Sequence, residues 1–265
     1  MLTSVTNPLV KQVVALQRRK ERDEAGLFVI EGRRFVAEAL RRGAPLQRLY
    51  YCPDLVGESD WEALAAEARA RNVTCEEVSA QVFRKMSGTE GPQGVLAVAA
   101  HLKRTWTDIR LGPADVLLVI DGLQDPGNLG TILRTALAAG VTQVVLTRGT
   151  VDLYNQKVLR STMGVLFDLV ILTEAEADEV LRFCRERVLP LVTADVRGEE
   201  IYHTEALQPP LALVVGNEGN GPCQVLREGA ERLVRIPMAG GVESLNVAIA
   251  TGILLYEIAR HCRFL

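Results

Sequence analysis

The sequence predicts an α/β protein in which a parallel sheet is preceded by a smaller α/β unit. Two observations support this class. Six apolar, β-branched runs in the second part of the chain alternate with helical patterns, as in a parallel sheet covered on both faces. A polar stretch separates these runs from a shorter alternation of strands and helices near the start. The 265 residues, 48% of them hydrophobic, suffice for a full-sized core.

The first hundred residues predict the smaller unit. The expected elements are a basic helix around residues 7–23, strands at 27–32, 46–52, 74–79 and 95–101, and helices at 33–43 and 61–72. The glycines and proline of residues 83–94 predict a loop before the last strand. The polar segment "LKRTWTDIRLGPAD" follows, so the predicted domains are residues 1–108 and 109–265.

The second part predicts the parallel sheet. Its expected strands are 116–121, 143–149, 169–174, 188–195, 211–218 and 232–238. In open parallel sheets, ligands bind beyond the carboxyl ends of the strands. Three such ends carry polar and glycine residues, namely 121–140, 216–222 and 236–246.

The first strand end runs into a helix expected to begin near Asn128, which is a candidate for its N-cap. Gly127 and Gly130 permit tight backbone conformations. Arg134, one or two turns into the helix, could reach a phosphate near the helix start. Taken alone, these residues favour a capped helix with a surface arginine.

A dinucleotide-binding alternative follows from the same loop. The Rossmann fingerprint requires Gly-x-Gly-x-x-Gly after the first strand and an acid about twenty residues later. Here the loop reads Gly-Asn-Leu-Gly and the second strand ends in Arg148. An NADP-dependent oxidoreductase is therefore poorly supported, although the arginine would suit a 2′-phosphate.

The other two strand ends place polar side chains beside glycines. Asn217 and Glu218 stand between glycines 216, 219 and 221, where the backbone can approach a ligand. In the last, Gly240 and Gly241 precede Ser244, the expected cap of a helix of about sixteen residues. That helix is apolar on nearly every face, so we expect it to be covered by its own sheet and by a partner subunit or another internal element.

Composition excludes several classes of protein. The five cysteines are scattered without a Cys-x-x-Cys pair, which argues against a disulfide framework and a zinc site and suits a reducing cytosol. His101, His203 and His261 share no spacing with them, so no metal is expected. Without a signal peptide pattern or a run of about 18 apolar residues, a cytoplasmic protein with no membrane partner is expected.

Charge is distributed unevenly along the chain. Residues 1–50 contain ten Lys or Arg and five acids, a net charge of +5, whereas the whole chain carries −3. A local basic field attracts polyanions. Charge alone slightly favours a solvated helix face over a binding surface.

Taken together, three segments give the sequence a family resemblance. In this order, "DPGNLGTILRTALAAG", "LVVGNEGNGP" and "IPMAGGVESLNVAIATGILLYE" resemble the three motifs of the SpoU/TrmH family of RNA ribose 2′-O-methyltransferases, within the SPOUT superfamily. The match covers most of residues 115–262, and no motif position departs from the pattern. The N-terminal part, from "SVTNPLVKQ" to "SGTEGPQGVLAV", resembles that family's ribosomal-protein-like substrate-binding domain.

The resemblance implies a deep trefoil knot in the parallel-sheet domain, a homodimer and the methyl donor S-adenosylmethionine. The positions matching the family's donor site are Gly216, Ile236, Met238, Gly241 and Leu245. Family catalytic roles fall on Asn128, Arg134, Glu218, Ser244 and Asn246.

The resemblance also implies ribosomal RNA as the substrate, and 23S is favoured over 16S. With this substrate, RNA binding becomes the favoured interpretation of the basic N-terminal segment. The candidate RNA-binding residues are Lys11, Arg18, Arg19, Lys20, Arg33 and Arg34. Two alternatives stay open, a transfer RNA substrate and a non-catalytic RNA-binding or ribosome-assembly protein of the same fold.

Overall fold

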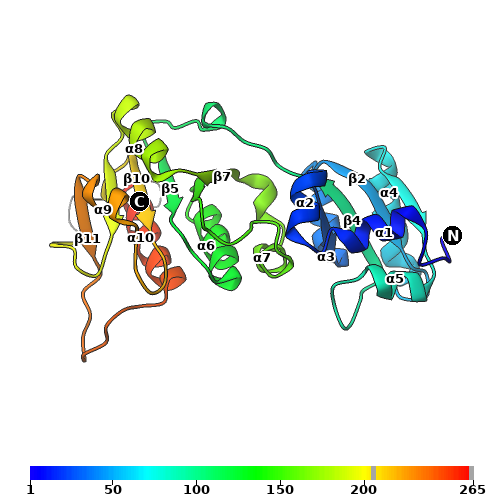
Figure 1. Cartoon of the computed structure of the whole chain (residues 1–265). Helices are drawn as coiled ribbons and strands as arrows, with labels where there is room; N and C mark the ends of the chain where they lie inside the picture. The colour runs from blue at the N-terminus through cyan, green and yellow to red at the C-terminus, as the bar shows by residue number, and fades with distance from the viewer. Residues whose placement is uncertain (204–206, 263–265) are drawn as a thin grey trace. The chain divides into compact units, whose positions relative to one another are not determined.

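A computed structural model describes residues 1–203 and 207–262 (Figure 1). The chain divides into two compact units. The first contains residues 1–102 and 154–167, and the second contains residues 103–153 and the chain from residue 168 onward. The segment 154–167 lies between two strands of the second unit in sequence and nevertheless belongs to the first.

The first unit is built on a mixed four-stranded sheet. Its strand order is β1 (Leu27–Glu31), β4 (Val95–Ala100), β2 (Leu46–Tyr51) and β3 (Thr74–Glu77). Strand β4 is antiparallel to both β1 and β2, whereas β2 and β3 are parallel. Phe28, Tyr50 and Phe83 are fully buried in its core.

Five helices come from the N-terminal sequence, and three of them correct our expectations. They are α1 (Pro8–Ala15), α2 (Arg19–Ala25), α3 (Arg33–Arg41), α4 (Glu58–Ala70) and α5 (Ala80–Met86). The single basic helix expected over 7–23 is wrong, because the chain turns between α1 and α2. The buried Arg22 stabilises that corner, since its Nη1 donates to the carbonyl oxygens of Leu16 and Gln17, both at 3.0 Å.

The loop expected over residues 83–94 is wrong at its start. Ser79 caps α5 by accepting a hydrogen bond from the Val82 N–H at 3.4 Å, and the helix continues to Met86. Val82, Phe83 and Met86 are fully buried. Burial of this apolar face stabilises a helix beyond the point where we expected the loop to begin.

Helix α7 (Gln156–Thr162) lies within segment 154–167 and packs in the first unit. Gln156 Nε2 donates to the carbonyl of Val29 in β1 at 2.8 Å. Gly164 has a φ of +92°, and a Cβ added there would lie 2.8 Å from the Cβ of Glu38 on α3. Glycine therefore permits both the turn after α7 and its close approach to α3.

The second unit contains a parallel sheet of seven strands. Their order is β7 (Val170–Ala175), β6 (Gln143–Thr147), β5 (Val116–Ile120), β10 (Leu211–Val215), β8 (Leu191–Ala194), β11 (Arg232–Arg235) and β9 (Glu200–Ile201). All paired neighbours are parallel. Strands β5, β6 and β10 are buried along their whole length, as expected for a sheet covered on both faces. The six expected strands are confirmed, and the short edge strand β9 is additional.

The helices of the second unit are α6 (Pro126–Ala138), α8 (Ala177–Glu186), α9 (Gln224–Glu228) and α10 (Val247–Cys262), with a 3-10 turn at Trp106–Asp108. A second 3-10 turn, Val165–Asp168, ends the segment after α7. Helix α10 has the sixteen residues expected and packs against α6. Within the described ranges, no helix is long and apolar enough to span a bilayer.

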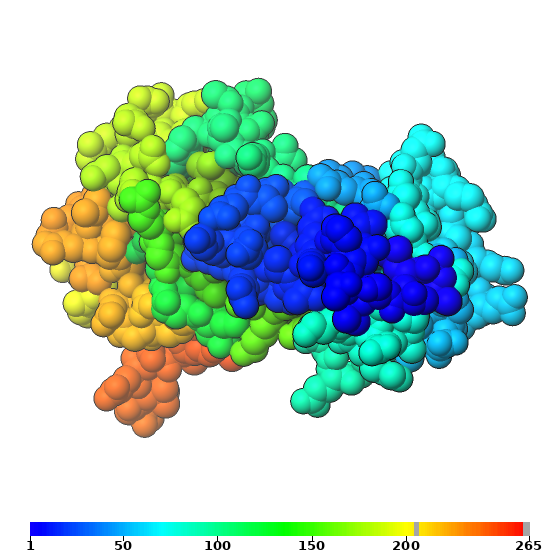
Figure 2. Space-filling view, turned by 45° about the vertical axis from the view of Figure 1, so that its right-hand side comes forward, coloured from blue at the N-terminus to red at the C-terminus, as the bar shows by residue number. Residues whose placement is uncertain are grey.

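Between β11 and α10 the chain forms a long loop, residues 236–246, that extends from the sheet (Figure 1, orange). The space-filling view shows it as an orange projection from the surface (Figure 2). Gly240 and Gly241 have φ values of +68° and +75°, with nothing within 4 Å of an added Cβ. Their glycine identity is required by the backbone conformation rather than by crowding.

Candidate functional site

The three polar strand ends lie at one edge of the parallel sheet. Strands β5 and β10 are neighbours at its centre, and β11 is separated from β10 by β8. Because all these strands are parallel, the loops that follow them leave from the same carboxyl edge. The sheet topology thus brings together segments that are about a hundred residues apart in sequence.

Glu218, in the loop after β10, holds the loop after β5. Its carboxylate accepts hydrogen bonds from the backbone N–H groups of Gln124 at 3.2 Å and Asp125 at 3.0 Å, and from Asn128 Nδ2 at 3.1 Å. Burial by itself would raise the pKa of Glu218, but the hydrogen bonds, led by that from Asp125, lower it overall. The side chain is therefore an ionised clamp on the start of α6.

Asn246 connects the third loop to the same place. Its Nδ2 donates to Asn128 Oδ1 at 3.0 Å, and Asn128 in turn donates to Glu218. Its Oδ1 accepts from the backbone N–H groups of Ala248 at 2.9 Å and Ile249 at 3.3 Å. One amide side chain thus caps α10 and ties it to α6.

Both expected helix caps are wrong. Asp125, rather than Asn128, caps α6, because its Oδ1 accepts from the Asn128 N–H at 2.8 Å and Pro126 occupies the first turn. Asn246, rather than Ser244, caps α10. Asn128 and Asn246 are the site's bridging pair, and Ser244 lies exposed in the loop without a side-chain hydrogen bond to any described residue.

Two further polar residues belong to the site, and one of them, Asp121, was missed from sequence. Asp121, the last residue before the first loop, is 6% exposed, and its carboxylate accepts from Thr147 Oγ1 and from the Cys223 N–H, both at 2.6 Å. Asn217 donates from Nδ2 to the Gly122 carbonyl at 2.9 Å. An acid at the end of a wholly apolar strand was the available signal for Asp121.

Close backbone packing requires glycine at position 216. It directly follows β10, and a Cβ built on it would lie 2.0 Å from the nitrogen of Pro222 and 2.2 Å from the carbonyl carbon of Gly221. The contact arises because the loop folds back, with the Asn217 and Gly221 backbones exchanging hydrogen bonds of 3.1 and 2.9 Å. Any side chain at this position would push the loop away from the strand.

Arg134 lies apart from the hydrogen-bonded cluster. It is exposed on α6, about 12 Å of helix rise beyond Pro126. That is slightly more than two turns, farther than expected. Its guanidinium makes no hydrogen bond or ion pair with any residue of 1–203 or 207–262. The structure leaves this cation available to an anionic ligand.

The expected donor-site residues are compatible with a ligand held by backbone groups. Ile236, Met238 and Leu245 are each half-buried, and Gly216 and Ile236 follow strands of the same sheet edge. Within the described chain, the backbone N–H groups of residues 238–245 donate no hydrogen bonds. Free amides beside half-buried apolar side chains suit S-adenosylmethionine, which has an apolar and a polar part. No described group of three His, Cys, Asp or Glu residues could hold a metal.

The expected RNA-binding residues fall into two classes. Arg19 pairs with Asp23 at 3.4 Å, Lys20 with Glu24 at 3.7 Å, and Arg33 with Asp60. In contrast, Lys11, Arg18 and Arg34 are exposed and have no side-chain partner among the described residues. Only this second group offers positive charge that no neighbouring acid offsets.

Comparison with known proteins gives family matches to both units. Residues 115–256 match the model described as the SpoU rRNA Methylase family, and residues 7–97 match an MRM3-like substrate binding domain. The chain is 35% identical over 260 residues to the 23S rRNA (guanosine(2553)-2′-O)-methyltransferase RlmP of Bacillus subtilis (strain 168), covering 97% of this chain and 98% of the relative.

Solved structures agree over the whole length. An AdoMet-bound rRNA methyltransferase from Sinorhizobium meliloti superposes with a TM-score of 0.88 at 36% identity, covering 98% of this chain and 97% of that one. A structure described as an RNA 2′-O ribose methyltransferase gives a TM-score of 0.81 at 38% identity, with 98% of both chains covered.

Proposed function

The chain belongs to the SpoU rRNA methylase family, and from this premise we propose that it transfers the methyl group of S-adenosylmethionine to a ribose 2′-hydroxyl of 23S ribosomal RNA. The relative from B. subtilis is named for guanosine, so the proposed target is a guanosine. The observation that carries the proposal is the chain of hydrogen bonds Asn246–Asn128–Glu218, which joins the loop before α10, the first turn of α6 and the loop after β10 at the sheet edge.

Five positions are proposed to hold the cofactor. These are Gly216, Ile236, Met238, Gly241 and Leu245. When bound, S-adenosylmethionine would supply an electrophilic methyl group on a sulfonium. The free backbone amides of residues 238–245 support this assignment, because they leave donors for the polar parts of the cofactor. The Gly240–Gly241 turn lets the chain reverse around it.

Arg134 is the proposed catalytic residue. A hydroxyl is a weak nucleophile and needs activation. A guanidinium has no acceptor for the proton, but its fork can bind a phosphate bidentately and stabilise an alkoxide as it develops. We assign Arg134 to the phosphate beside the target ribose, with a phosphate oxygen or a water taking the proton. Its exposure and lack of a partner among described residues support this role.

The remaining site residues are proposed to position the loops and the ribose. Glu218 and Asn128 fix the first loop through the hydrogen bonds described above. Asn246 fixes the start of α10 against that loop. Ser244 is exposed and lies two residues before Asn246, and we assign it to positioning the ribose.

The proposed domain 1–108 is assigned to RNA binding and the proposed domain 109–265 to catalysis, with segment 154–167 packing in the first unit. Of the candidate cations, Lys11, Arg18 and Arg34 are retained as principal phosphate contacts, because they lack a described partner. Arg19, Lys20 and Arg33 contribute less in this proposal, since each must leave an acid to bind a phosphate. Because the substrate is ribosomal RNA, the proposed compartment is the cytoplasm.

A homodimer and a trefoil knot are also proposed. Ile249, Ile253 and Tyr256 recur at helical spacing on α10, and Ile249 and Tyr256 remain 58% and 51% exposed. An exposed apolar stripe of this kind is typical of an association surface. The knot follows from family membership, and the Asn246–Asn128 contact gives α10 an anchor beside the loop that would be threaded.

The proposed function is tested by methyl transfer. Labelled S-adenosylmethionine would be incubated with unmodified 23S ribosomal RNA, 16S ribosomal RNA and transfer RNA separately, using wild type and Arg134→Ala. We expect label in a 2′-O-methylguanosine of 23S RNA, lost in the variant. Label confined to transfer RNA would show that the substrate is transfer RNA and not 23S ribosomal RNA. Donor binding without transfer to any RNA would favour the non-catalytic alternative.

A further inference from the structure

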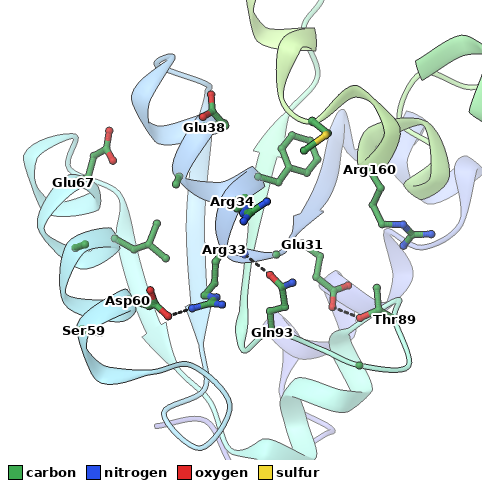
Figure 3. Close-up of a pocket in the computed structure, with 17 residues that line it drawn as sticks. Glu31, Arg33, Arg34, Glu38, Ser59, Asp60, Glu67, Thr89, Gln93 and Arg160 are labelled. Carbon is green, nitrogen blue, oxygen red and sulfur yellow. Dashed lines mark hydrogen bonds and ion pairs between the residues drawn. The ribbon is translucent and has the colours of Figure 1, made fainter. Parts of the chain in front are cut away.

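A pocket in the first unit lies away from the three loops of the sheet edge. It has a volume of about 930 Å³ and is lined by the start of α3, one face of α4, residues 89–93 and the end of α7 (Figure 3). All of these segments belong to the first unit. Its size lies within the range of pockets that bind small ligands, about 300–1,000 Å³.

Some charged side chains of the pocket have hydrogen-bond or ion-pair partners and others have none among the described residues. The Glu31 carboxylate accepts from the Gly88 N–H at 2.9 Å and from Thr89 Oγ1 at 2.8 Å, and Arg33 is paired with Asp60. Arg34 and Arg160 are both exposed, and neither has a side-chain partner among the described residues. The lining holds four acids and three arginines, and Arg34 and Arg160 are the two of these arginines that no described acid pairs with.

The two arginines come from distant parts of the sequence. In Figure 3, Arg34 lies at the start of α3, and the side chain of Arg160 extends from α7 at the other side of the pocket. Arg160 was not among our candidates, because its position between two strands of the second unit gave no sign that α7 belongs to the first. The acidic side chains Asp60 and Glu67 lie on the α4 wall, and Glu31 and Glu38 also line the pocket, so attraction for phosphate is local to Arg34 and Arg160.

Met163 adds an apolar surface beside these cations. It ends α7 with a φ of +51°, a conformation in which glycine is the usual residue, and its side chain is 51% exposed in the pocket wall. Phe35, also in the wall, is nearly buried. An exposed thioether in a pocket that is also lined by two cations suits a ligand with a flat apolar face and flanking negative charge.

We infer that this pocket receives one unpaired nucleotide of the RNA substrate, with its two flanking phosphates on Arg34 and Arg160 and its base against Met163. The inference rests on the proposed function, since it makes the pocket a second contact for the same RNA. Proteins commonly recognise RNA through single-stranded nucleotides turned out of the stack. The pocket thus recognises an unpaired nucleotide through residues that lie outside the three methyl-transfer motifs.

The test measures binding of fluorescent, unmodified 23S rRNA fragments to the full chain as a function of salt. Each lost phosphate contact should lower the slope of log K against log[salt] by about 0.7, so Arg34→Ala and Arg160→Ala each lose about 0.7 and the double variant about 1.4. If the electrostatic part vanishes near 1 M salt, each single change weakens binding about eightfold at roughly 50 mM. Met163→Ala should weaken binding without changing the slope.

Two controls separate the pocket from general charge effects. Arg185→Ala removes an exposed arginine of α8 that has no described side-chain partner, outside the pocket. The double variant Arg33→Ala/Asp60→Ala removes an ion pair of the pocket wall without changing net charge. Arg185→Ala should bind RNA within about twofold of wild type. The Arg33→Ala/Asp60→Ala variant should lose less affinity than Arg34→Ala or Arg160→Ala, because Arg33 is paired with Asp60 and is only a minor proposed phosphate contact.

Measurement of KM and kcat for methyl transfer distinguishes failure of this inference from failure of the proposed function. Arg34→Ala and Arg160→Ala should raise KM for RNA and leave kcat at saturating RNA unchanged. Wild-type methyl transfer with unaltered KM and salt slopes in both variants would overturn the pocket assignment and leave the function intact. Absence of RNA binding by wild type would overturn both. A free nucleoside monophosphate that fills the pocket without displacing RNA would also overturn it.

Discussion

Asn246 Nδ2 donates a hydrogen bond to Asn128 Oδ1 at 3.0 Å, joining residues that are 118 positions apart in the chain. The same Asn246 caps α10, and the same Asn128 donates to Glu218. The start of one helix is therefore fixed against the start of another by two amide side chains.

The two functions of Asn246 can be separated by substitution. Asn246→Ala should lower the free energy of unfolding by about 1 kcal/mol through loss of the cap, and should reduce methyl transfer. Asn246→Ser retains a capping oxygen but cannot reach Asn128 with an amide, so it should recover most of the stability and little of the activity. Urea unfolding and methyl transfer would be measured on both. Equal activity in the serine variant and wild type would contradict a role for the bridge.

Loss of the Glu218 charge should show a characteristic dependence on pH. Because the folded-state pKa of Glu218 is lowered, its stabilising contribution is present above the ordinary carboxyl value of about 4.3 and is lost as pH falls through the lower folded value. Glu218→Gln should therefore be less stable than wild type at pH 7, and the difference should shrink below about pH 4.3.

The control for this change is Glu186→Gln, which alters an exposed acid on α8 that has no described side-chain partner. It should follow wild type from pH 7 to pH 3. Unfolding by urea at each pH provides the measurement. A gap between Glu218→Gln and wild type that widened on acidification would refute the ionised clamp.

Substitutions of Arg134 should affect turnover and leave folding intact. The side chain is exposed and has no partner among the described residues, so the free energy of unfolding should change by less than about 0.5 kcal/mol. Turnover should fall about 100-fold or more in Arg134→Ala. Arg134→Lys keeps the charge without the bidentate fork and should also be strongly impaired. Near-native turnover of the lysine variant would exclude the geometric role.

Two glycines of one loop should respond very differently to alanine. At Gly216 the new Cβ would lie 2.0 Å from a backbone atom, whereas at Gly219 its nearest neighbour is a side-chain oxygen at 3.6 Å. Gly216→Ala should lower stability by about 1–3 kcal/mol or more and disrupt the loop. Gly219→Ala should be tolerated. Thermal unfolding of both variants checks the prediction, and equal melting temperatures would contradict the packing described for Gly216.

The proposed dimer predicts that a charge on the α10 stripe will prevent association. Ile249→Asp places a carboxylate on the exposed apolar stripe and should yield a monomer by light scattering after size exclusion. Val188→Asp changes an 88% exposed valine elsewhere in the second unit and should leave the mass unchanged. A wild-type monomer at micromolar concentration would refute the proposal for this surface.

The proposed knot predicts that the chain, when pulled from its two ends, will reach a smaller end-to-end extension than an unknotted chain of the same length. A fully extended chain spans at most about 3.3–3.6 Å per residue. Pulled from its ends, a knotted chain tightens instead of opening, so its final extension should fall measurably short of that limit. A full extension would show that the C-terminal segment is not threaded.

Sequence periodicity predicted the second sheet well, because buried parallel strands are continuous apolar runs. It missed β9 because Glu200–Ile201 is a two-residue edge strand with no apolar period. The basic helix was misjudged for a different reason. Its break at the α1–α2 corner depends on where Arg22 donates, and that is a tertiary contact.

The sequence also located the three site loops, but assigned some residues the wrong local role. Their distance to the apolar runs predicts Asn128 and Ser244 as caps. The caps are Asp125 and Asn246, and the actual role of Asn128 depends on Glu218, ninety residues away. Capping propensity is local, whereas a bridge between loops is set by strand order. The pairings that offset Arg19, Lys20 and Arg33 were similarly not evident from the net charge.

Because residues 154–167 belong to the first unit, the chain passes from one unit to the other three times, near residues 102, 153 and 167. The two units are consequently not exchangeable modules in evolution or in engineering. A recombination event at the 102/103 junction alone would transfer a first unit without α7, leaving β1 without its contact from Gln156 and α3 without its contact at Gly164. Inheritance of the first unit should therefore be coupled to inheritance of the strand crossover between β6 and β7.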